Sequence, residues 1–600
     1  MPLPKTTTPP PRILIQAVEP LVDCGRYPVK RTVGERVDVY ATIVKDGHDA
    51  LRAAVRVKPA KGKAREEPLA ALGNDRFGGT FVVDRPGRCT FAIVAWTDRV
   101  ATWQDELRRK VDAGQTDLDG ELAEGAALLG VASLTVEEGL AAEAGDRHGE
   151  VASDALPVDV DREVGRFGAW YELFPRSFGG FRGVAAVLPQ LAELGFDVVY
   201  LPPIHPIGVT NRKGRNNTLA AGKGDPGSPW AIGSELGGHD AIDPSLGTWK
   251  DFDAMIAAGR EAGIEIALDF AIQCSPDHPW LKKHPEWFNR RPDGTLKYAE
   301  NPPKRYQDIY NVNFESEDWR ALWKALLDVV LGWVRRGVKA FRVDNPHTKP
   351  VAFWEWLIGE VRKEDPDVVF LAEAFTRPAM MTTLAKSGFS QSYTYFTWKN
   401  AKWELEEYVA ELVAWAPFYR SNAFVNTPDI LHEYLQVGGP PAFQARLVLA
   451  ATLSPAYGMY SGFERYENVA VRPGSEEYLD SEKYEVKKRT LDGPLLPLIG
   501  RLNAIRRAEP ALQHVDNLRW LETENDQLIA YAKGNRMICV VNVDPFATRE
   551  GACVVPVSLG LPPAFEVRDL LTGDEFVWRA GRNYVALGPG QSHVLKANVR

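Results

Sequence analysis

The chain has 600 residues, of which 45% are hydrophobic, and a formal net charge of −9 at pH 7. One hydrophobic core stops growing at roughly 250–300 residues, so we expect several domains. The negative charge argues against nucleic acid or an anionic membrane as a partner, and no apolar run in the sequence is long enough for a transmembrane helix.

The first 100 residues predict a disordered tail followed by a β-sandwich. Residues 1–12 are rich in proline and threonine, which favours disorder. Over residues 13–100, short alternating runs of polar and apolar residues are separated by turn residues, as in an antiparallel sandwich. The N-terminus lacks the apolar stretch of a signal peptide, and the five cysteines are scattered. We therefore expect reduced thiols and a cytoplasmic protein.

Residues 101–150 change in composition and predict a helical insertion. Leu118, Leu122, Leu128 and Leu129 recur at helical spacing among alanines and acidic residues. The sandwich is too small to cover such an apolar stripe. We therefore expect the insertion to pack either on the barrel or against another subunit.

Residues 165–512 predict a (β/α)8 TIM barrel, the centre of a multidomain α/β protein. Apolar strand-like segments alternate with amphipathic helices, and eight such units run from GAWYELF to PAYGMYSGFE. Irregular excursions over residues 205–245 and 271–315 follow the second and third strands, and loops of this length at a barrel strand are usually functional. Short strands over residues 513–600 predict a C-terminal antiparallel β-domain.

Four of the predicted barrel strands deliver a carboxylate at or just beyond their carboxyl ends. These acids are Asp269, Asp344, Glu373 and Asp429, in the segments IALDF, FRVDN, FLAEAF and FVNTPD. Arg342 lies two residues before Asp344, so both side chains project to the same side of one strand. Alone, this pair is equally well explained as a salt bridge. Because isolated buried carboxylates are costly, four of them on the ligand-binding face of a barrel favour a catalytic site over packing.

The order Asp, Arg-x-Asp, Glu, Asp on successive strands resembles the α-amylase superfamily, over roughly residues 165–600. The segments FRVDNPHTKP, LAEAFTRP and LDFAIQCSPDHPW resemble, more narrowly, bacterial maltosyltransferases that transfer maltose from α-maltose 1-phosphate to α-1,4-glucans. The resemblance implies a retaining glycosyltransferase of glucan or glycogen biosynthesis that needs no metal or cofactor. It also favours a homodimer in which the helical insertion forms the contact.

The resemblance also assigns roles to single residues. Asp344 would be the nucleophile, Glu373 the acid/base and Asp429 the stabiliser of the transition state, while Asp269 would order the site. The charge of Arg342 would keep Asp344 ionised, and the apolar flanks of Glu373 predict a raised pKa. The positions that match the family's substrate-binding residues are Lys213, Asn301, Lys304, Tyr306 and Asn345 around the phosphate, Ser228, Gln273, Lys483 and Tyr484 around the maltosyl unit, and Arg342 beside the nucleophile.

Several positions depart from the pattern of ordinary amylases. Gln273 and Cys274 stand where amylases usually have Asn-His, and that Asn commonly binds a structural calcium, so we expect no such calcium. Pro428 replaces the usual histidine before the last acid, and His347 lies where amylases have Lys then His. An endo-amylase is thereby disfavoured. The alternatives are another superfamily enzyme (a glucan hydrolase, a branching enzyme or a trehalose-forming isomerase) and a non-catalytic glucan-binding protein.

Overall fold

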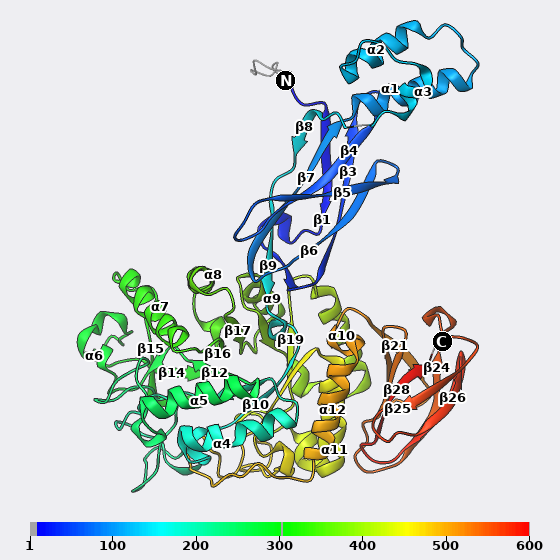
Figure 1. Ribbon diagram of the computed structural model, residues 1–600. Coiled ribbons are helices and arrows are strands. Elements are labelled where there is room, and N and C mark those ends of the chain that lie inside the picture. Colours follow the sequence, from blue (N-terminus) through cyan, green and yellow to red (C-terminus); the bar gives the residue numbers. More distant parts are fainter. Residues whose placement is uncertain (1–8, 144, 302–303, 599–600) are drawn as a thin grey trace. The chain divides into compact units, whose positions relative to one another are not determined.

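The structure, a computed structural model, describes residues 9–143, 145–301 and 304–598, without the side chains of Asn301 and Lys304. The chain divides into two compact units, Met1–Val160 and Asp161–Arg600. Figure 1 labels the elements of both. The predicted fold class is confirmed: an N-terminal β domain, a (β/α)8 barrel and a C-terminal antiparallel β domain are all present.

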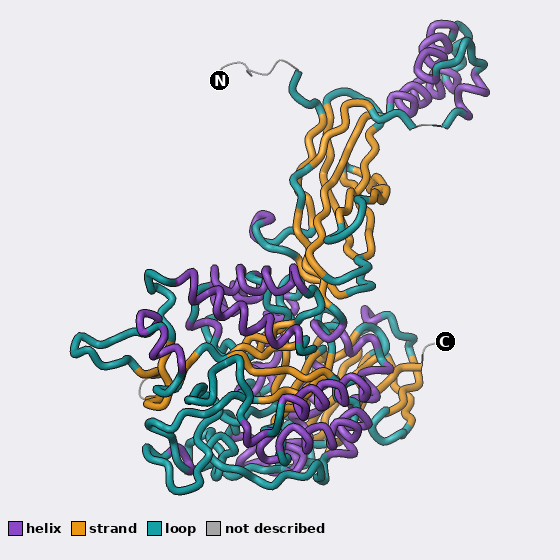
Figure 2. The backbone as a smooth tube through the Cα atoms, turned by 60° about the vertical axis from the view of Figure 1, so that its left-hand side comes forward, coloured by secondary structure: helices purple, strands orange, loops and turns teal. Residues whose placement is uncertain are grey.

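The first unit is built on a nine-stranded sheet (Figure 2). Its strands are β1 (Ile13–Glu19), β2 (Val29–Thr32), β3 (Arg36–Lys45), β4 (Leu51–Lys58), β5 (Arg65–Gly73), β6 (Arg76–Val82), β7 (Gly87–Thr97), β8 (His148–Ala152) and β9 (Leu156–Asp161). β5 pairs with β4 through its first half and with β6 through its second, so it joins the two halves of the sheet. Buried and exposed residues alternate along β3, as the period-two runs predicted.

Three helices lie between β7 and β8. They are α1 (Arg99–Asp112), α2 (Asp119–Leu129) and α3 (Val136–Ala141). They pack around Trp103, which is 3% exposed and whose Nε1 donates to the carbonyl oxygen of Glu121 at 2.7 Å. Gly125 and Gly139 approach the indole so closely that a Cβ would lie 2.0 Å and 2.6 Å from it. Only glycine therefore allows α2 and α3 to close over this ring.

The leucines of the helical insertion belong to this small core. Leu118 is buried against Trp103, and Leu122, Leu128 and Leu129 pack around them. The three helices therefore cover part of the stripe against one another, while Leu122, Leu128 and Leu129 stay half-buried. The expected contact of the stripe with a further surface stays a prediction.

The second unit contains a closed barrel of eight parallel strands. They are β10 (Gly168–Glu172), β11 (Val198–Leu201), β12 (Glu265–Phe270), β16 (Ala340–Val343), β17 (Val369–Ala372), β18 (Gln391–Tyr393), β19 (Ser421–Phe424) and β20 (Ala456–Tyr460). Each strand is followed by a helix: α4 (Gly180–Glu193), α5 (Trp249–Ala262), α7 (Trp319–Arg335), α8 (Val351–Glu364), α9 (Pro378–Lys386), α10 (Lys402–Trp415), α11 (Glu433–Leu453) and α12 (Leu496–Ala508). Alternation of apolar strands with amphipathic helices in the sequence predicted this architecture.

Two excursions leave the barrel at the carboxyl ends of its strands. After β11, residues 205–245 are irregular apart from short 3-10 turns. After β12, a three-stranded sheet forms in the order β13-β15-β14, with β13 (Gln273–Cys274), β14 (Tyr298–Asn301) and β15 (Lys304–Asn311), and α6 (Pro279–Lys283) lies beside it in the sequence. These excursions stand on the face where barrels bind ligands.

The C-terminal strands form an eight-stranded antiparallel sheet. They are β21 (Leu518–Thr523), β22 (Leu528–Lys533), β23 (Met537–Asn542), β24 (Arg549–Val555), β25 (Ala564–Asp569), β26 (Glu575–Arg579), β27 (Gly581–Leu587) and β28 (Ser592–Asn598). Their inner faces enclose a separate core that includes Leu595 and Val567. Across the described part of the chain, none of the helices has the length and apolar character needed to cross a membrane.

Candidate active site

One arginine joins three of the four predicted acids at the carboxyl ends of the barrel strands. Arg342 Nη1 lies 2.8 Å from Asp269 Oδ2 and 2.9 Å from Asp344 Oδ1, and its Nη2 lies 2.6 Å from Glu373 Oε1. The Arg342 side chain is only 6% exposed. Three carboxylates around one buried guanidinium form a charge cluster that packing alone does not require, because each desolvated charge is costly.

Asp344 directly follows β16 and is arranged to stay ionised. Gln273 Nε2 donates to its Oδ2 at 3.0 Å, and Asn345 Nδ2 donates to the same oxygen at 3.3 Å. Burial raises the pKa of Asp344, but the positive charges of Arg342 and Lys349 outweigh it and hold that pKa below its ordinary value. An ionised, partly shielded carboxylate is suited to attack an electrophilic carbon.

Glu373 directly follows β17 and has the opposite tendency. Burial raises its pKa well above the ordinary value, and the charge of Asp344 adds to the rise although Arg342 opposes it. Two neighbouring carboxyl groups whose pKa values are driven apart can divide the work, one as nucleophile and one as acid/base. The apolar flanks of Glu373 in the sequence predicted this direction.

The fourth acid, Asp429, makes no ion pair with Arg342 among the described residues, although its charge adds to the raised pKa of Glu373. It lies five residues beyond the end of β19, on a loop, and 42% of its side chain is exposed. Its Oδ1 accepts a hydrogen bond from Lys483 Nζ, and that ammonium lies 5.3 Å from the ring centre of Trp230 and 5.8 Å from that of Tyr484. Burial lowers the pKa of Lys483, but Asp429 outweighs it and raises that pKa well above its ordinary value.

Three of the positions matched to phosphate binding, Asn301, Lys304 and Tyr306, lie on strands of the small sheet after β12. Gln273 on β13 pairs in register with Asn311 on β15, the strand that carries Tyr306. Because the Gln273 side chain also donates to Asp344, it links this strand to the proposed nucleophile. Lys213 Nζ donates to Gln307 Oε1 at 2.6 Å, which brings the excursion after β11 onto the same strand. Burial lowers the pKa of Lys213. The side chains of Asn301 and Lys304, also predicted for this pocket, lie outside the described residues.

Ser228, predicted to hold the maltosyl unit, and His347, a departure from the amylase pattern, are linked to the acids less directly. Ser228 is buried, at 5% exposed, and lies two residues before Trp230, whose ring Lys483 approaches. His347 lies in the turn after β16, and burial lowers its pKa. Among the described residues, Ser228 and His347 make no hydrogen bond or ion pair with the four acids, although the charge of Asp344 opposes the lowering of the His347 pKa.

Sequence reasoning missed several polar residues of the site. Glu172 ends β10, is 1% exposed, and has a pKa raised well above its ordinary value by burial. Tyr200 on β11 donates from its hydroxyl to Asp269, whose pKa is raised to about 7 by burial. The signal for Glu172 was available, because GAWYE is another apolar strand that ends in an acid. Tyr200 carried no such signal.

The positions where amylases usually have Asn-His are occupied differently. Gln273 binds Asp344, and Cys274 is fully buried beside His239 and His278. The ring nitrogens of both histidines take part in hydrogen bonds. Trp280 N donates to His278 Nδ1 at 3.1 Å, and His278 Nε2 lies 3.1 Å from His239 Nδ1. His239 Nε2 lies 2.8 Å from the carbonyl oxygen of Ala271. This chain of hydrogen bonds ties the two excursions together with neutral groups.

Comparisons with known proteins place the chain in a family. Residues 11–158 match the family model described as alpha-1,4-glucan:maltose-1-phosphate maltosyltransferase, domain N/S, residues 169–320 match the alpha amylase catalytic domain, and residues 520–597 match the model described as GLGE, C-terminal. A protein of Streptomyces coelicolor named alpha-1,4-glucan:maltose-1-phosphate maltosyltransferase 2 is 49% identical over 98% of this chain and 96% of its own length. The enzyme of that name from Mycolicibacterium smegmatis is 47% identical over 97% of this chain and 96% of its own length.

The chain belongs to the alpha-1,4-glucan:maltose-1-phosphate maltosyltransferase family. The family resemblance found in the sequence is thereby confirmed. Among solved structures, an alpha-amylase from Lactobacillus plantarum superposes with a TM-score of 0.57 at 23% identity, over 73% of this chain and all of that chain. The maltogenic alpha-amylase AmyB from Thermotoga neapolitana gives a TM-score of 0.58 at 20% identity, over the same shares. The two amylases therefore share the fold of this maltosyltransferase family member.

Proposed function

We propose that this chain transfers maltosyl units from α-maltose 1-phosphate to the non-reducing end of α-1,4-glucans and releases phosphate. Relatives at 45–49% identity over nearly their full length carry the name of this reaction. The observation that carries the residue assignments is the Arg342 cluster, which joins Asp344 and Glu373 through one guanidinium. A hydrolase, a branching enzyme, an isomerase or a non-catalytic binding protein has no comparable support.

The proposed chemistry proceeds in two steps with retention of configuration. In the first, a carboxylate oxygen of Asp344 attacks C1 of the donor while the C1–O bond to phosphate breaks and its electron pair leaves with the phosphate. Glu373 gives its proton to the departing group. In the second, a hydroxyl of the glucan attacks C1, the ester to Asp344 breaks, and the Glu373 carboxylate takes the hydroxyl proton. The lowered pKa of Asp344 and the raised pKa of Glu373 suit these roles.

The substrate-binding roles rest on the family match and on where the side chains lie. Lys213 and Asn345 are donors near β15 and Asp344, as a phosphate dianion requires, and Asn301, Lys304 and Tyr306 complete the proposed phosphate set. Ser228, Gln273, Lys483 and Tyr484 are proposed to hold the maltosyl unit. Asp429, held beside Lys483, would bind sugar hydroxyls in the transition state.

A phosphate-release assay tests the proposal. Incubation with α-maltose 1-phosphate and a maltooligosaccharide is expected to release phosphate and to lengthen the acceptor by two glucose units. Release of reducing sugar from starch without phosphate would favour the hydrolase. Glucan binding without turnover of any glucosyl donor would favour the non-catalytic reading.

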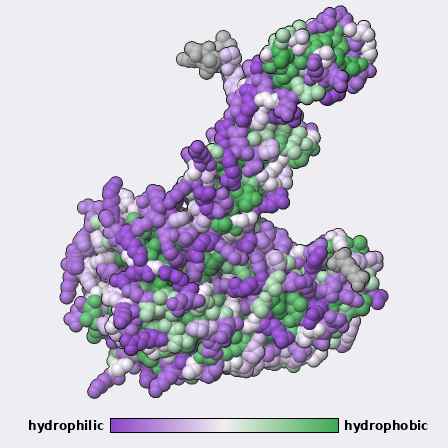
Figure 3. Space-filling view, viewed as in Figure 1, coloured by the Kyte–Doolittle hydropathy of each residue, from purple (hydrophilic) through white to green (hydrophobic). Residues whose placement is uncertain are grey.

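A homodimer through the helical insertion is also proposed. Leu118 is buried, but Leu122, Leu128 and Leu129 are only half-buried. Val131, between α2 and α3, is 47% exposed, and Figure 3 shows apolar residues on the surface of this segment. Deletion of residues 105–145 is expected to yield monomers and to weaken glucan turnover. Light scattering of the full-length protein decides the first point, since a monomer at micromolar concentration contradicts the dimer. Cytoplasmic location stays a prediction from cysteine usage.

A further inference from the structure

The short turn that follows β10 contains an arginine that contacts two loops at once. Arg176 lies in the 3-10 turn Pro175–Ser177. Its Nη1 donates to the carbonyl oxygen of Gly227 at 3.0 Å, and its Nη2 donates to the carbonyl oxygen of Glu482. Gly227 belongs to the excursion after β11, and Glu482 to the loop after β20. One guanidinium therefore joins two segments that are distant in sequence.

Each of these carbonyl groups directly precedes a residue proposed to hold the maltosyl unit. Ser228 follows Gly227, and Lys483 follows Glu482. Because the peptide group is planar, fixing a carbonyl oxygen also fixes the orientation of the next residue's nitrogen and Cα. The two hydrogen bonds from Arg176 therefore fix the backbone positions of Ser228 and Lys483.

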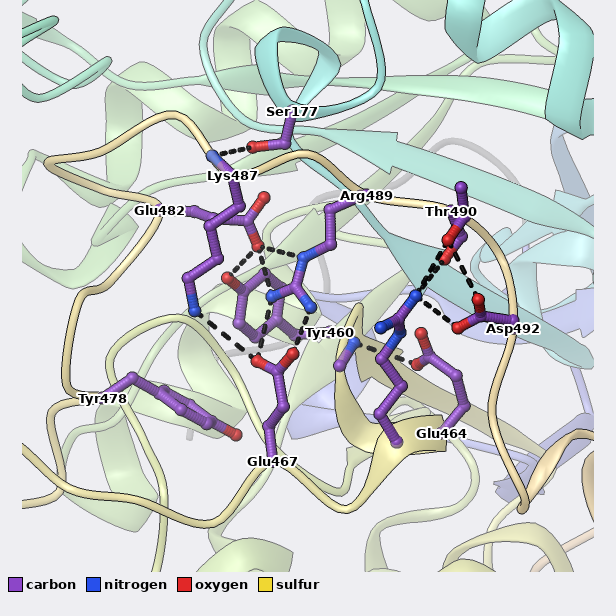
Figure 4. Close-up of polar contacts among 12 residues, drawn as sticks. Ser177, Tyr460, Glu464, Glu467, Tyr478, Glu482, Lys487, Arg489, Thr490 and Asp492 are labelled. Atoms are coloured by element: carbon purple, nitrogen blue, oxygen red, sulfur yellow. Dashed lines mark hydrogen bonds and ion pairs between the residues drawn. The ribbon is translucent and has the colours of Figure 1, made fainter.

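A buried polar network around Tyr460 and Arg489 fixes the side chain of Glu482 (Figure 4). The side chain of Glu482 is 0% exposed. It accepts hydrogen bonds from the hydroxyl of Tyr460, from Arg489 Nε at 3.0 Å and from Arg489 Nη2 at 2.8 Å. Arg489 also pairs with Glu467 on the same loop. The backbone around Glu482 is thereby anchored on both its side-chain and its carbonyl sides.

The turn after β10 holds the same loop at two more points. The carbonyl oxygen of Ser177 accepts a hydrogen bond from Arg489 N at 2.9 Å, and Ser177 Oγ accepts one from Lys487 N at 3.2 Å. Figure 4 shows Ser177 above Lys487. Arg176 is therefore one member of an anchor that extends from the end of a barrel strand.

Stability alone explains Arg176 poorly. Its Nε is buried without a hydrogen-bond partner among the described residues. Burial lowers the pKa of Arg176 to about 10 although the charge of Glu482 opposes the shift. A desolvated guanidinium whose hydrogen bonds go to neutral carbonyl groups costs free energy that an apolar side chain of similar volume would not. The contacts it makes are better explained by what they position.

We propose that Arg176 is a positioning residue that fixes the two loops carrying Ser228 and Lys483, and so shapes the subsite for the maltosyl unit of the donor. The inference rests on the proposed function, because it takes these two residues as maltosyl contacts. It assigns to Arg176 no contact with the reacting atoms.

The test uses Arg176→Lys, because a single ammonium cannot span both carbonyl groups as the planar guanidinium does. We expect the KM for α-maltose 1-phosphate to rise about tenfold, with kcat and the KM for the acceptor changed by less than about threefold. Arg176→Gln is measured in parallel, so that a folding failure of one variant leaves the other to decide. Wild-type phosphate release is checked first, and its absence would count against the proposed function rather than against the anchor.

Arg506→Lys is the matched control. Arg506 is 1% exposed, donates to the carbonyl oxygen of Pro455 just before β20, and has its pKa lowered to about 10 by burial. This contact lies at the amino end of β20, whereas the site lies at the carboxyl ends of the barrel strands. We therefore expect no change in the KM for the donor even if the melting temperature falls. An equal rise in KM in both variants would overturn the proposal.

A combined variant separates positioning from general loss of structure. Because Arg176 is proposed to act through both Ser228 and Lys483, Arg176→Lys should raise the KM for α-maltose 1-phosphate by less than about threefold when both residues are already alanine. A tenfold rise in that background would overturn the proposal, as would a wild-type donor KM in folded Arg176→Lys and Arg176→Gln.

Discussion

The proposed nucleophile and acid/base are held differently from the proposed sugar-binding pair. Asp344 and Glu373 directly follow barrel strands and share the buried guanidinium of Arg342. Asp429 and Lys483 lie on loops, and Asp429 keeps 42% of its side chain exposed. Backbone pairing within the barrel is enough to place the first two. The loop-borne pair needs separate anchors, so it should be easier to perturb without loss of chemistry.

The largest effect is expected at the strand ends, from Asp344→Ala. Loss of the nucleophile should lower phosphate-release turnover by about 10⁴-fold or more, while the fold survives because the residue stands at a strand end. Steady-state assays and circular dichroism measure the two parts. The control is Asp253→Ala, which removes an exposed acid of α5 paired with Arg336 at 3.1 Å and should leave turnover unchanged. Near-wild-type turnover of Asp344→Ala would refute the assignment.

Glu373→Ala should separate the two steps. Phosphate is a good leaving group, so the ester on Asp344 still forms, but the acceptor hydroxyl lacks its base, and turnover should fall about 10³-fold. Mass spectrometry after addition of α-maltose 1-phosphate should show the protein one maltosyl unit heavier. The double variant with Asp344→Ala should show no adduct. Absence of the adduct in Glu373→Ala itself would contradict this division of roles.

On the loop side, Lys483→Ala should act mainly on binding. It removes the partner of Asp429 and a contact to the sugar, so kcat/KM for the donor should fall about 10- to 100-fold, mostly through KM. Lys487→Ala is the control on the same loop. Its Nζ lies 3.6 Å from Glu467 Oε2 and, among the described residues, pairs with none of Asp344, Glu373 and Asp429. Equal losses in both variants would show that the loop, rather than the Lys483 ammonium, is what matters.

The smallest effect concerns pH. Asp344 must be ionised, and its lowered pKa keeps activity down to below about pH 4, the ordinary aspartate value. Protonated Glu373 speeds the first step without being essential to it, so its raised pKa extends full activity well above about pH 4.3, the ordinary glutamate pKa. Single-turnover phosphate release by the wild type should therefore decline by a few-fold as pH rises through the Glu373 pKa.

Glu373→Gln sharpens this measurement, because its side chain cannot ionise. The ionisation of the donor phosphate affects both proteins alike and cancels in their ratio. We expect the variant to lack the alkaline decline seen in the wild type. An identical decline in both would mean that another group, rather than Glu373, titrates there.

How far the site could be predicted depends on the range of the contacts. The positions of Asp344 and Glu373 followed from contiguous residues, since an apolar strand and the acid at its end are neighbours in sequence. The same rule applied to Glu172 and was overlooked. The bonds from Lys483 to Asp429, 54 residues apart, and from Lys213 to Gln307, 94 residues apart, have no local signature, and only the family resemblance pointed to these lysines.

Periodicity and short motifs, which neighbouring residues encode, were sufficient to predict the barrel, the strand ends that carry the acids and the family. Only the folded chain shows that Arg342 joins three carboxylates, that the leucines of the helical insertion pack around Trp103, and that Arg176 joins two loops. These contacts depend on how distant segments pack. The free energy of each contact depends on the burial and charge of its partners, which a local sequence pattern does not specify.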